Sequence, residues 1–142
     1  MIKKRIALVA HDNKKKELIE WTKNHIERML KCEIYATGTT GRLLEADLGL
    51  TVNCLHSGPL GGDQQIGSLI AEGKIDSLIF FWDPLEPLPH DPDIKALLRL
   101  AVVWNIPFAC NGATADFLFS TDMFFIYERK VPSFKTYQDR KL

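Results

Sequence analysis

Polar residues that could bind an anion and move a proton follow four apolar segments of this chain. His11 and Asp12 follow the first segment, and a cluster of glycines and threonines at 37–41 follows the second. Residues 56–63 follow the third segment, and Asp83 follows the fourth. Open α/β sheets bind ligands at the carboxyl ends of their strands. If the four segments are strands of one sheet, these residues surround one site for an anionic ligand.

The residues that follow two of these apolar segments have features that suit a phosphate. Lys14, Lys15 and Lys16 lie in the first turn of a predicted helix, where exposed cations oppose the helix dipole at a cost of roughly 0.3–1 kcal/mol each. They are either solvated or meet an anion bound there. The sequence Thr37-Gly-Thr-Thr-Gly41 is either a structural turn or a phosphate cradle of backbone N–H groups and hydroxyls.

Other residues in these segments could carry protons. Asp63 follows a glycine-rich turn and is either the cap of the next helix or a carboxylate that a substrate can approach. Asp91 is expected to cap a helix, whereas His90 beside it and His11 are candidate proton carriers. A metal site built from His11, His90 and nearby carboxylates is disfavoured because no HxxxH-type spacing supports it.

The elements that would position these residues alternate between strand-like and helix-like patterns, which favours βαβ units and a parallel sheet. The predicted strands are 5–10, 33–37, 52–55, 77–82 and 106–110. The predicted helices are 13–29, 42–48, 62–72, one that follows Asp91-Pro92, and one that starts at Thr114. An edge strand is predicted at 123–127, followed by a charged tail.

The composition indicates one domain over residues 1–142, with a core at 1–120 and a tail at 121–142. Lys plus Arg and Asp plus Glu number 18 each, so no net charge steers the protein to nucleic acid or to a membrane surface. No segment approaches the ~18 apolar residues of a membrane-spanning helix. Three isolated cysteines are typical of reduced thiols, and the expected location is the cytoplasm.

Seven segments together resemble methylglyoxal synthase over roughly residues 5–120. They are Leu-Val-Ala-His-Asp12, Tyr-Ala-Thr-Gly-Thr-Thr-Gly41, Ser-Gly-Pro-Leu-Gly-Gly-Asp-Gln-Gln65, Phe-Phe-Trp-Asp-Pro84, Pro-His-Asp-Pro-Asp93, Lys-Ala-Leu-Leu-Arg99 and Cys-Asn-Gly-Ala-Thr-Ala-Asp116. The resemblance implies a three-layer flavodoxin-like α/β domain with a mainly parallel five-stranded sheet, assembled as a homohexamer. It also implies conversion of dihydroxyacetone phosphate to methylglyoxal and phosphate, as a bypass of lower glycolysis, without a metal or organic cofactor. Inorganic phosphate is the expected inhibitor.

The resemblance also implies roles for individual residues. Asp63 matches the catalytic base, Asp93 a second catalytic carboxylate, and His11 and His90 the residues that contact the substrate. The matching phosphate-binding positions, together with Asp12 in the first loop, are Lys15, Thr37, Gly38, Thr39, Thr40, Ser57 and Gly58.

Two departures and two alternatives accompany the resemblance. His56 stands where a less basic residue is expected, and the tail after Ser120 is short and follows the family pattern poorly. Similar domains in carbamoyl phosphate synthetase bind effectors without catalysis, so a phosphate-ligand sensor is one alternative; a triose phosphate isomerase-like activity is the other. The joint presence of Asp63, His90 and Asp93 favours an enzyme, because a sensor needs no base.

Overall fold

The core of the protein is a five-stranded parallel sheet with the order β3-β2-β1-β4-β5. A computed structural model describes residues 3–86 and 91–142. The strands are β1 (Lys4–Ala10), β2 (Cys32–Thr37), β3 (Val52–Leu55), β4 (Ser77–Phe81) and β5 (Phe108–Ala109). All five predicted strands are therefore confirmed. β1 pairs with both β2 and β4. From β1 the chain adds β2 and β3 toward one edge of the sheet, and then β4 and β5 toward the other edge.

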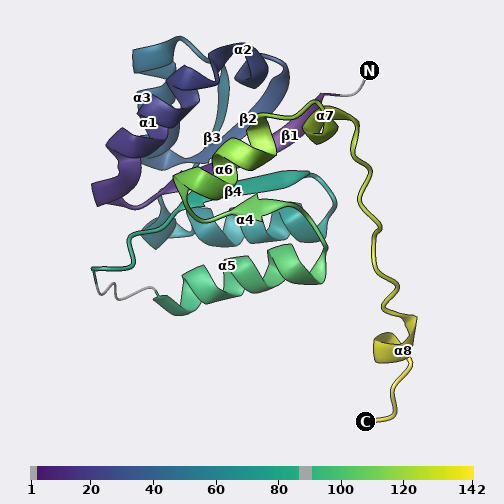
Figure 1. Cartoon of the computed structure of the whole chain (residues 1–142). Coiled ribbons are helices and arrows are strands. Elements are labelled where there is room, and N and C mark those ends of the chain that lie inside the picture. Colours follow the sequence, from purple (N-terminus) through teal and green to yellow (C-terminus); the bar gives the residue numbers. More distant parts are fainter. Residues whose placement is uncertain (1–2, 87–90) are drawn as a thin grey trace.

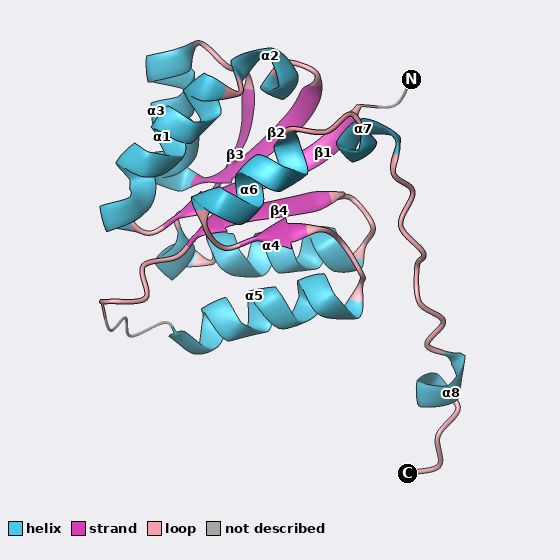
Figure 2. Ribbon diagram, viewed as in Figure 1, coloured by secondary structure: helices cyan, strands magenta, loops and turns pink. Residues whose placement is uncertain are grey.

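Helices cover both faces of the sheet, which gives three layers (Figures 1 and 2). The helices are η1 (Asp12–Lys14), α1 (Lys15–Asn24), α2 (Ile26–Met29), α3 (Gly38–Leu48), η2 (Gly58–Leu60), α4 (Gly62–Ala71), α5 (Asp91–Val103), α6 (Gly112–Phe119), α7 (Met123–Ile126) and α8 (Lys135–Gln138). One core cluster packs α1, α3 and α6 against the sheet, and a second packs α4 and α5 against the opposite face. The α/β architecture predicted from the sequence is confirmed.

The central strands are apolar on both sides because helices cover both faces of the sheet. In β1, Ile6 and Leu8 join the first core cluster, whereas Ala7 and Val9 join the second. Side chains of a strand alternate between faces, so one short apolar run contributes to both cores.

Three predicted elements differ in the structure. The helix predicted over 13–29 is interrupted at His25, which separates α1 from α2. The helix predicted over 42–48 starts earlier, at Gly38. The edge strand predicted over 123–127 is wrong: Met123–Ile126 is the short helix α7. Phe124 and Phe125 pack against the first core cluster, so tertiary contacts override the β propensity of this aromatic segment.

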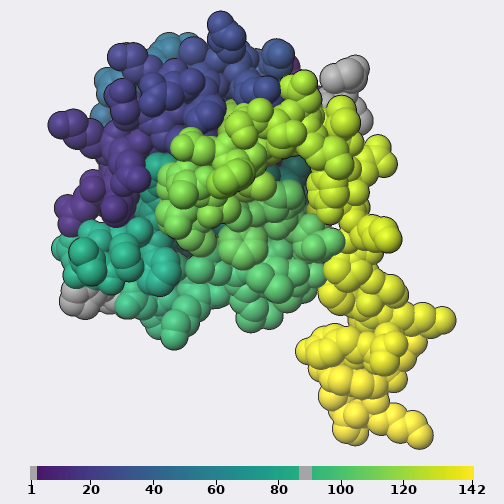
Figure 3. Space-filling model, viewed as in Figure 1, coloured from purple at the N-terminus to yellow at the C-terminus, as the bar shows by residue number. Residues whose placement is uncertain are grey.

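The part of the chain after α7 extends away from the rest of the molecule (Figure 3). They contain α8, and most of their side chains are exposed. Arg129 donates to the carbonyl oxygen of Trp104 at 2.5 Å, and the Phe134 ring lies 5.0 Å from that of Trp104. These contacts attach the start of the tail to the end of α5.

Candidate active site

Most of the residues predicted to form one site line a single cavity of about 260 Å³ at the carboxyl ends of β1 to β4. The predicted residues in its lining are His11, Asp12, Lys15, Thr37, Thr39, Thr40, Ser57, Gly58 and Asp63. The expectation that these separate segments meet is therefore correct, because the parallel strands bring all their carboxyl ends to one edge.

The remaining predicted residues do not line this cavity or lie outside the described residues. Gly38 supports the lining: its N–H donates to the carbonyl oxygen of His56 at 3.3 Å, and a Cβ there would come within 2.8 Å of the Ser57 nitrogen. Asp93 is partly buried in the first turn of α5 and is not part of the lining. His90 lies outside the described residues. The His56 side chain is exposed and is not part of the lining.

The N-terminus of α3 opens into the cavity. Thr37 is the N-cap, the helix starts at Gly38, and the first turn contains no acidic residue. Thr39 and Thr40 in that turn line the cavity. The first backbone N–H groups of a helix have no partner within the helix, and its dipole favours an anion there. The segment 37–41 is therefore a cap and first helical turn, and not a loop.

Thr40 supplies a further donor at this point. Its side chain is fully buried, and its Oγ1 has no hydrogen-bond partner among the described residues. Buried hydroxyls in proteins are nearly always paired. A bound oxyanion in the cavity would provide the missing acceptor.

Lys15 brings a positive charge to the same cavity. Its Nζ donates to the Ala10 carbonyl oxygen at 2.9 Å and to Asp12 Oδ1 at 2.8 Å. The Lys15 side chain is 17% exposed, whereas that of Asp12 is 98% exposed. The ammonium is thus held over the end of β1, and the opposing carboxylate is largely in solvent.

The imidazole of His11 is held in one tautomer. The backbone N–H of Asp83 donates to His11 Nδ1 at 3.0 Å. A backbone N–H can only donate, so Nδ1 must be the acceptor nitrogen and the neutral ring carries its proton on Nε2. The edge of the ring also contacts Phe80, with 5.2 Å between centroids. His11 can therefore act as a neutral hydrogen-bond donor.

Asp63 does not cap α4, which corrects one of the two interpretations of its position. The N-cap is Gly61, with φ 108°, and Asp63 lies in the first turn with 5% exposure. A Cβ on Gly58 would lie 3.3 Å from Asp63 Oδ2. The absence of that side chain leaves the carboxylate accessible from the cavity.

Asp83, expected near the site because it follows the fourth strand, lines the cavity, and so do Asn13 and Glu86, which sequence reasoning did not assign to the site. Asn13 Nδ2 donates to Asp83 Oδ2 at 3.1 Å and also to Glu86 Oε2. The hydrogen bond from Asn13, with one from the Leu85 N–H, lowers the pKa of Asp83. The only signal in the sequence was that Asp83 follows a strand, since the contact to Asn13 spans 70 residues.

Within 3–86 and 91–142, no three His, Cys, Asp or Glu side chains are grouped so that they could hold a metal ion. In the same ranges, no helix has the length and apolar character needed to cross a membrane.

Comparisons with known proteins agree on one family. A family model described as the MGS-like domain matches residues 17–110. Methylglyoxal synthase of Hahella chejuensis is 60% identical over 135 residues, which are 95% of this chain and 88% of that protein. The enzyme of that name from Coxiella burnetii is 55% identical over 99% of both chains. The alignment therefore extends into the tail, and this relative and the chain have nearly the same length.

A solved structure gives the same result. The crystal structure of methylglyoxal synthase from Elizabethkingia anophelis aligns with a TM-score of 0.93 and 52% sequence identity. The alignment covers 99% of this chain and 93% of that chain. The similarity thus includes nearly every described element and not only the sheet.

Proposed function

The chain belongs to the methylglyoxal synthase family of lyases, and we propose that it converts dihydroxyacetone phosphate to methylglyoxal and inorganic phosphate. The observation that carries the proposal is the cavity itself, which combines a buried carboxylate, a neutral histidine and the N-terminus of a helix. These groups match a reaction that removes one proton and then expels an anion.

The first step is removal of a proton from the hydroxymethyl carbon by Asp63. The C–H electron pair forms the C=C bond of an enediolate, and the proton goes to the carboxylate. A positioned base of this kind contributes roughly 10²–10⁴-fold to a rate. His11 donates from Nε2 to the carbonyl oxygen and stabilises the charge that develops there. By resemblance, His90 is a second donor and Asp93 a second carboxylate near the reaction.

The second step is elimination of phosphate. The hydroxyl on the deprotonated carbon then becomes a C=O bond and gives its proton to the departing phosphate. The C=C bond shifts to the carbon that carries the ester, and the C–O bond breaks with its electron pair on the phosphate. The released enol of methylglyoxal then gains a proton on carbon. Lys15, Thr39, Thr40 and the N-terminus of α3 hold the phosphate charge, with Thr37, Ser57 and Gly58 completing the lining. No metal or organic cofactor takes part.

We further propose that the enzyme works in the cytoplasm as a homohexamer that inorganic phosphate inhibits. The phosphate product occupies the same donors as the phosphate group of the substrate, so free phosphate competes for them. This part rests on the family resemblance and on the chemistry of the α3 N-terminus.

The test is an assay of both products in phosphate-free buffer with a metal chelator. Dihydroxyacetone phosphate should yield methylglyoxal and phosphate in equal amounts, far faster than without protein. Binding of the substrate with no release of either product would instead identify a phosphate-ligand sensor. Formation of glyceraldehyde 3-phosphate without phosphate release would identify an isomerase.

A further inference from the structure

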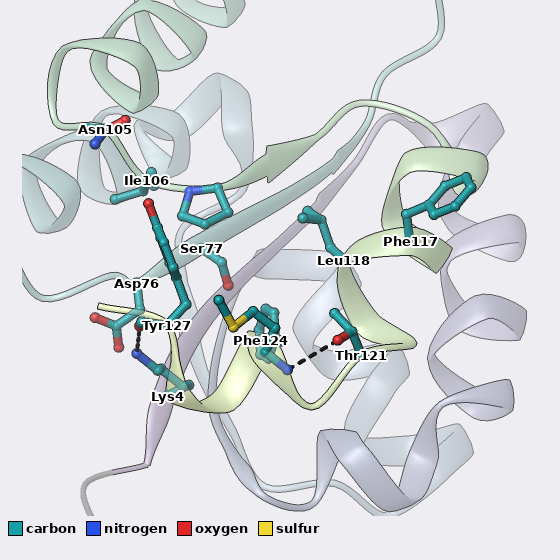
Figure 4. A pocket seen from close by; sticks show the side chains of 12 residues that line it. Lys4, Asp76, Ser77, Asn105, Ile106, Phe117, Leu118, Thr121, Phe124 and Tyr127 are labelled. Carbon is teal, nitrogen blue, oxygen red and sulfur yellow. Dashed lines mark hydrogen bonds between the residues drawn. The ribbon is translucent and has the colours of Figure 1, made fainter. Parts of the chain in front are cut away.

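A second cavity lies at the opposite end of the sheet from the candidate active site (Figure 4). It has a volume of about 390 Å³ and shares no lining residue with the first cavity. Lys4 and Ser77, the first residues of β1 and β4, contribute to it. The segment from α6 through α7 to Tyr127 covers it.

Most of the cavity wall is apolar. Ile106 and Pro107 come from the end of the α5–β5 connection, and Leu118 and Phe124 come from the covering segment. Pockets for small ligands have this character: an apolar lining with a few polar groups that fix orientation, and volumes of about 300–1,000 Å³.

The charged groups at the rim already have partners. Lys4 Nζ donates to the Tyr127 carbonyl oxygen at 2.6 Å. Asp76 accepts from Arg5 Nε at 3.1 Å and from Arg5 Nη2 at 3.1 Å. A charged ligand would have to displace the Lys4–Tyr127 contact or the Arg5–Asp76 ion pair to gain a counter-ion after losing its own hydration, which is unfavourable. These contacts favour a neutral occupant.

Ser77 differs from the other polar groups of this cavity. Its side chain is 2% exposed, and its Oγ has no hydrogen-bond partner within the part of the chain that the structure describes. Figure 4 shows the hydroxyl between the covering segment and the residues around Ile106. Because unpaired buried hydroxyls are rare in folded proteins, this atom indicates a missing partner inside the cavity.

The geometry points to a binding site for a small neutral molecule with an apolar ring and a single hydrogen-bonding group that pairs with Ser77. A cavity of about 150 Å³ accepts benzene, so a cavity of this size accommodates a bicyclic molecule. The site is independent of the proposed enzymatic activity, since neither its residues nor its ligand take part in that reaction.

Calorimetric titration of the full-length protein with indole and indene tests this site. The two probes have the same shape, but only indole carries an N–H that can donate to Ser77 Oγ. We expect indole to bind about three- to tenfold more tightly than indene, which is the effect of one hydrogen bond. In Ser77→Ala the affinity for indole should fall to that for indene. Thr40→Val, in the other cavity, should retain the preference.

Thermal unfolding of Ser77→Ala provides the control for folding, because removal of an unpaired hydroxyl should not lower the melting temperature. The site is excluded if neither probe binds, or if Ser77→Ala keeps the preference for indole. A crystal structure that shows a side chain of a second copy, or of residues 1–2, inside the cavity also overturns the proposal. Indole seated against Ser77 in that crystal supports it.

Discussion

Two strand-to-helix turns face the same cavity, but their helices begin differently. The turn from β2 to α3 is direct: Thr37 ends the strand and caps the helix, and no acidic residue lies in the first turn. The turn from β3 to α4 inserts the short helix η2 and a left-handed Gly61 before α4 starts. Asp63 then lies in the first turn of α4.

This difference fits the two tasks that we propose for this edge of the sheet. The positive end of α3 can bind an anionic ligand. Thr40 in its first turn adds a hydroxyl that has no hydrogen-bond partner among the described residues. The positive end of α4 instead stabilises the chain's own carboxylate at Asp63. We therefore propose that the first turn holds most of the phosphate charge and that the second turn supplies the base, with Ser57 and Gly58 of the second turn completing the phosphate lining.

Replacement of the base should have the largest effect. Asp63→Asn keeps the shape of the side chain but removes its basicity, so turnover of dihydroxyacetone phosphate should fall by about 10²–10⁴-fold. The measurement is the rate of methylglyoxal formation at saturating substrate. Asp116→Asn is the comparison, because Asp116 is an exposed carboxylate that does not line the cavity and has no proposed role in the reaction. Near-normal turnover in Asp63→Asn would exclude Asp63 as the base.

Removal of the Thr40 hydroxyl should affect binding more than turnover. Thr40→Val should weaken phosphate binding by about tenfold or more, since a hydrogen bond to a charged group contributes about 1.5–3 kcal/mol. The folded state should not lose stability, because the hydroxyl lost is buried and has no partner among the described residues. The measurements are KM for dihydroxyacetone phosphate and chemical denaturation.

Thr22→Val is the matched control for Thr40→Val. Thr22 is also a fully buried threonine in a helix, but its hydroxyl donates to the Leu18 carbonyl oxygen at 2.8 Å. This variant should leave KM unchanged. An equal rise of KM in both variants would mean that Thr40 acts through helix packing and not through a bond to phosphate.

The contact between the two turns can be tested at Gly62. A Cβ there would lie 1.9 Å from the His56 carbonyl oxygen, which also accepts the Gly38 N–H. Gly62→Ala should lower the free energy of unfolding by about 1–3 kcal/mol, as overpacking does, and should reduce activity by displacing Asp63. Gly112→Ala is the control, since its Cβ would meet Glu17 Oε1 at an ordinary 3.6 Å. Equal stability of the two variants would contradict the close packing of the turns.

Asp76 is a carboxylate outside both turns, and its ion pair with Arg5 makes the stability of the protein depend on pH. Burial alone would raise the pKa of Asp76, but hydrogen bonds and the charge of Arg5 outweigh burial and lower it. The stabilisation is thus complete above the unfolded pKa of about 3.9 and is lost as the pH falls through the lower folded value. Asp76→Asn should cost about 1–2 kcal/mol at pH 7, and progressively less below about pH 4 in denaturation experiments. A cost that is independent of pH would exclude this ion pair as its source.

The sheet and the place of the site could be predicted from the sequence because each strand is a short apolar run that ends in polar residues. The start of α3 could not be predicted in the same way, since Gly38 and Gly41 favour a loop. A Cβ at Gly41 would lie 2.7 Å from Cys54 Sγ, so this glycine allows close packing between elements. Such a requirement depends on residues that are distant in the sequence.

The polar contacts of the site depend on tertiary structure in the same way. The tautomer of His11 follows from the backbone N–H of Asp83, 72 residues away. The burial of Asp63 follows from the position of η2 between β3 and α4. Residue types and their order along the chain indicated the chemistry, whereas the protonation state and accessibility of each group required the fold.

The most direct test of the division between the two turns is calorimetric titration of inorganic phosphate into the wild type, Asp63→Asn and Thr40→Val. The account predicts that Asp63→Asn binds phosphate within about twofold of the wild type, although it has lost turnover, and that Thr40→Val binds about tenfold more weakly or worse. Loss of phosphate binding in Asp63→Asn, or unchanged binding in Thr40→Val, would contradict the separation of base and anion site.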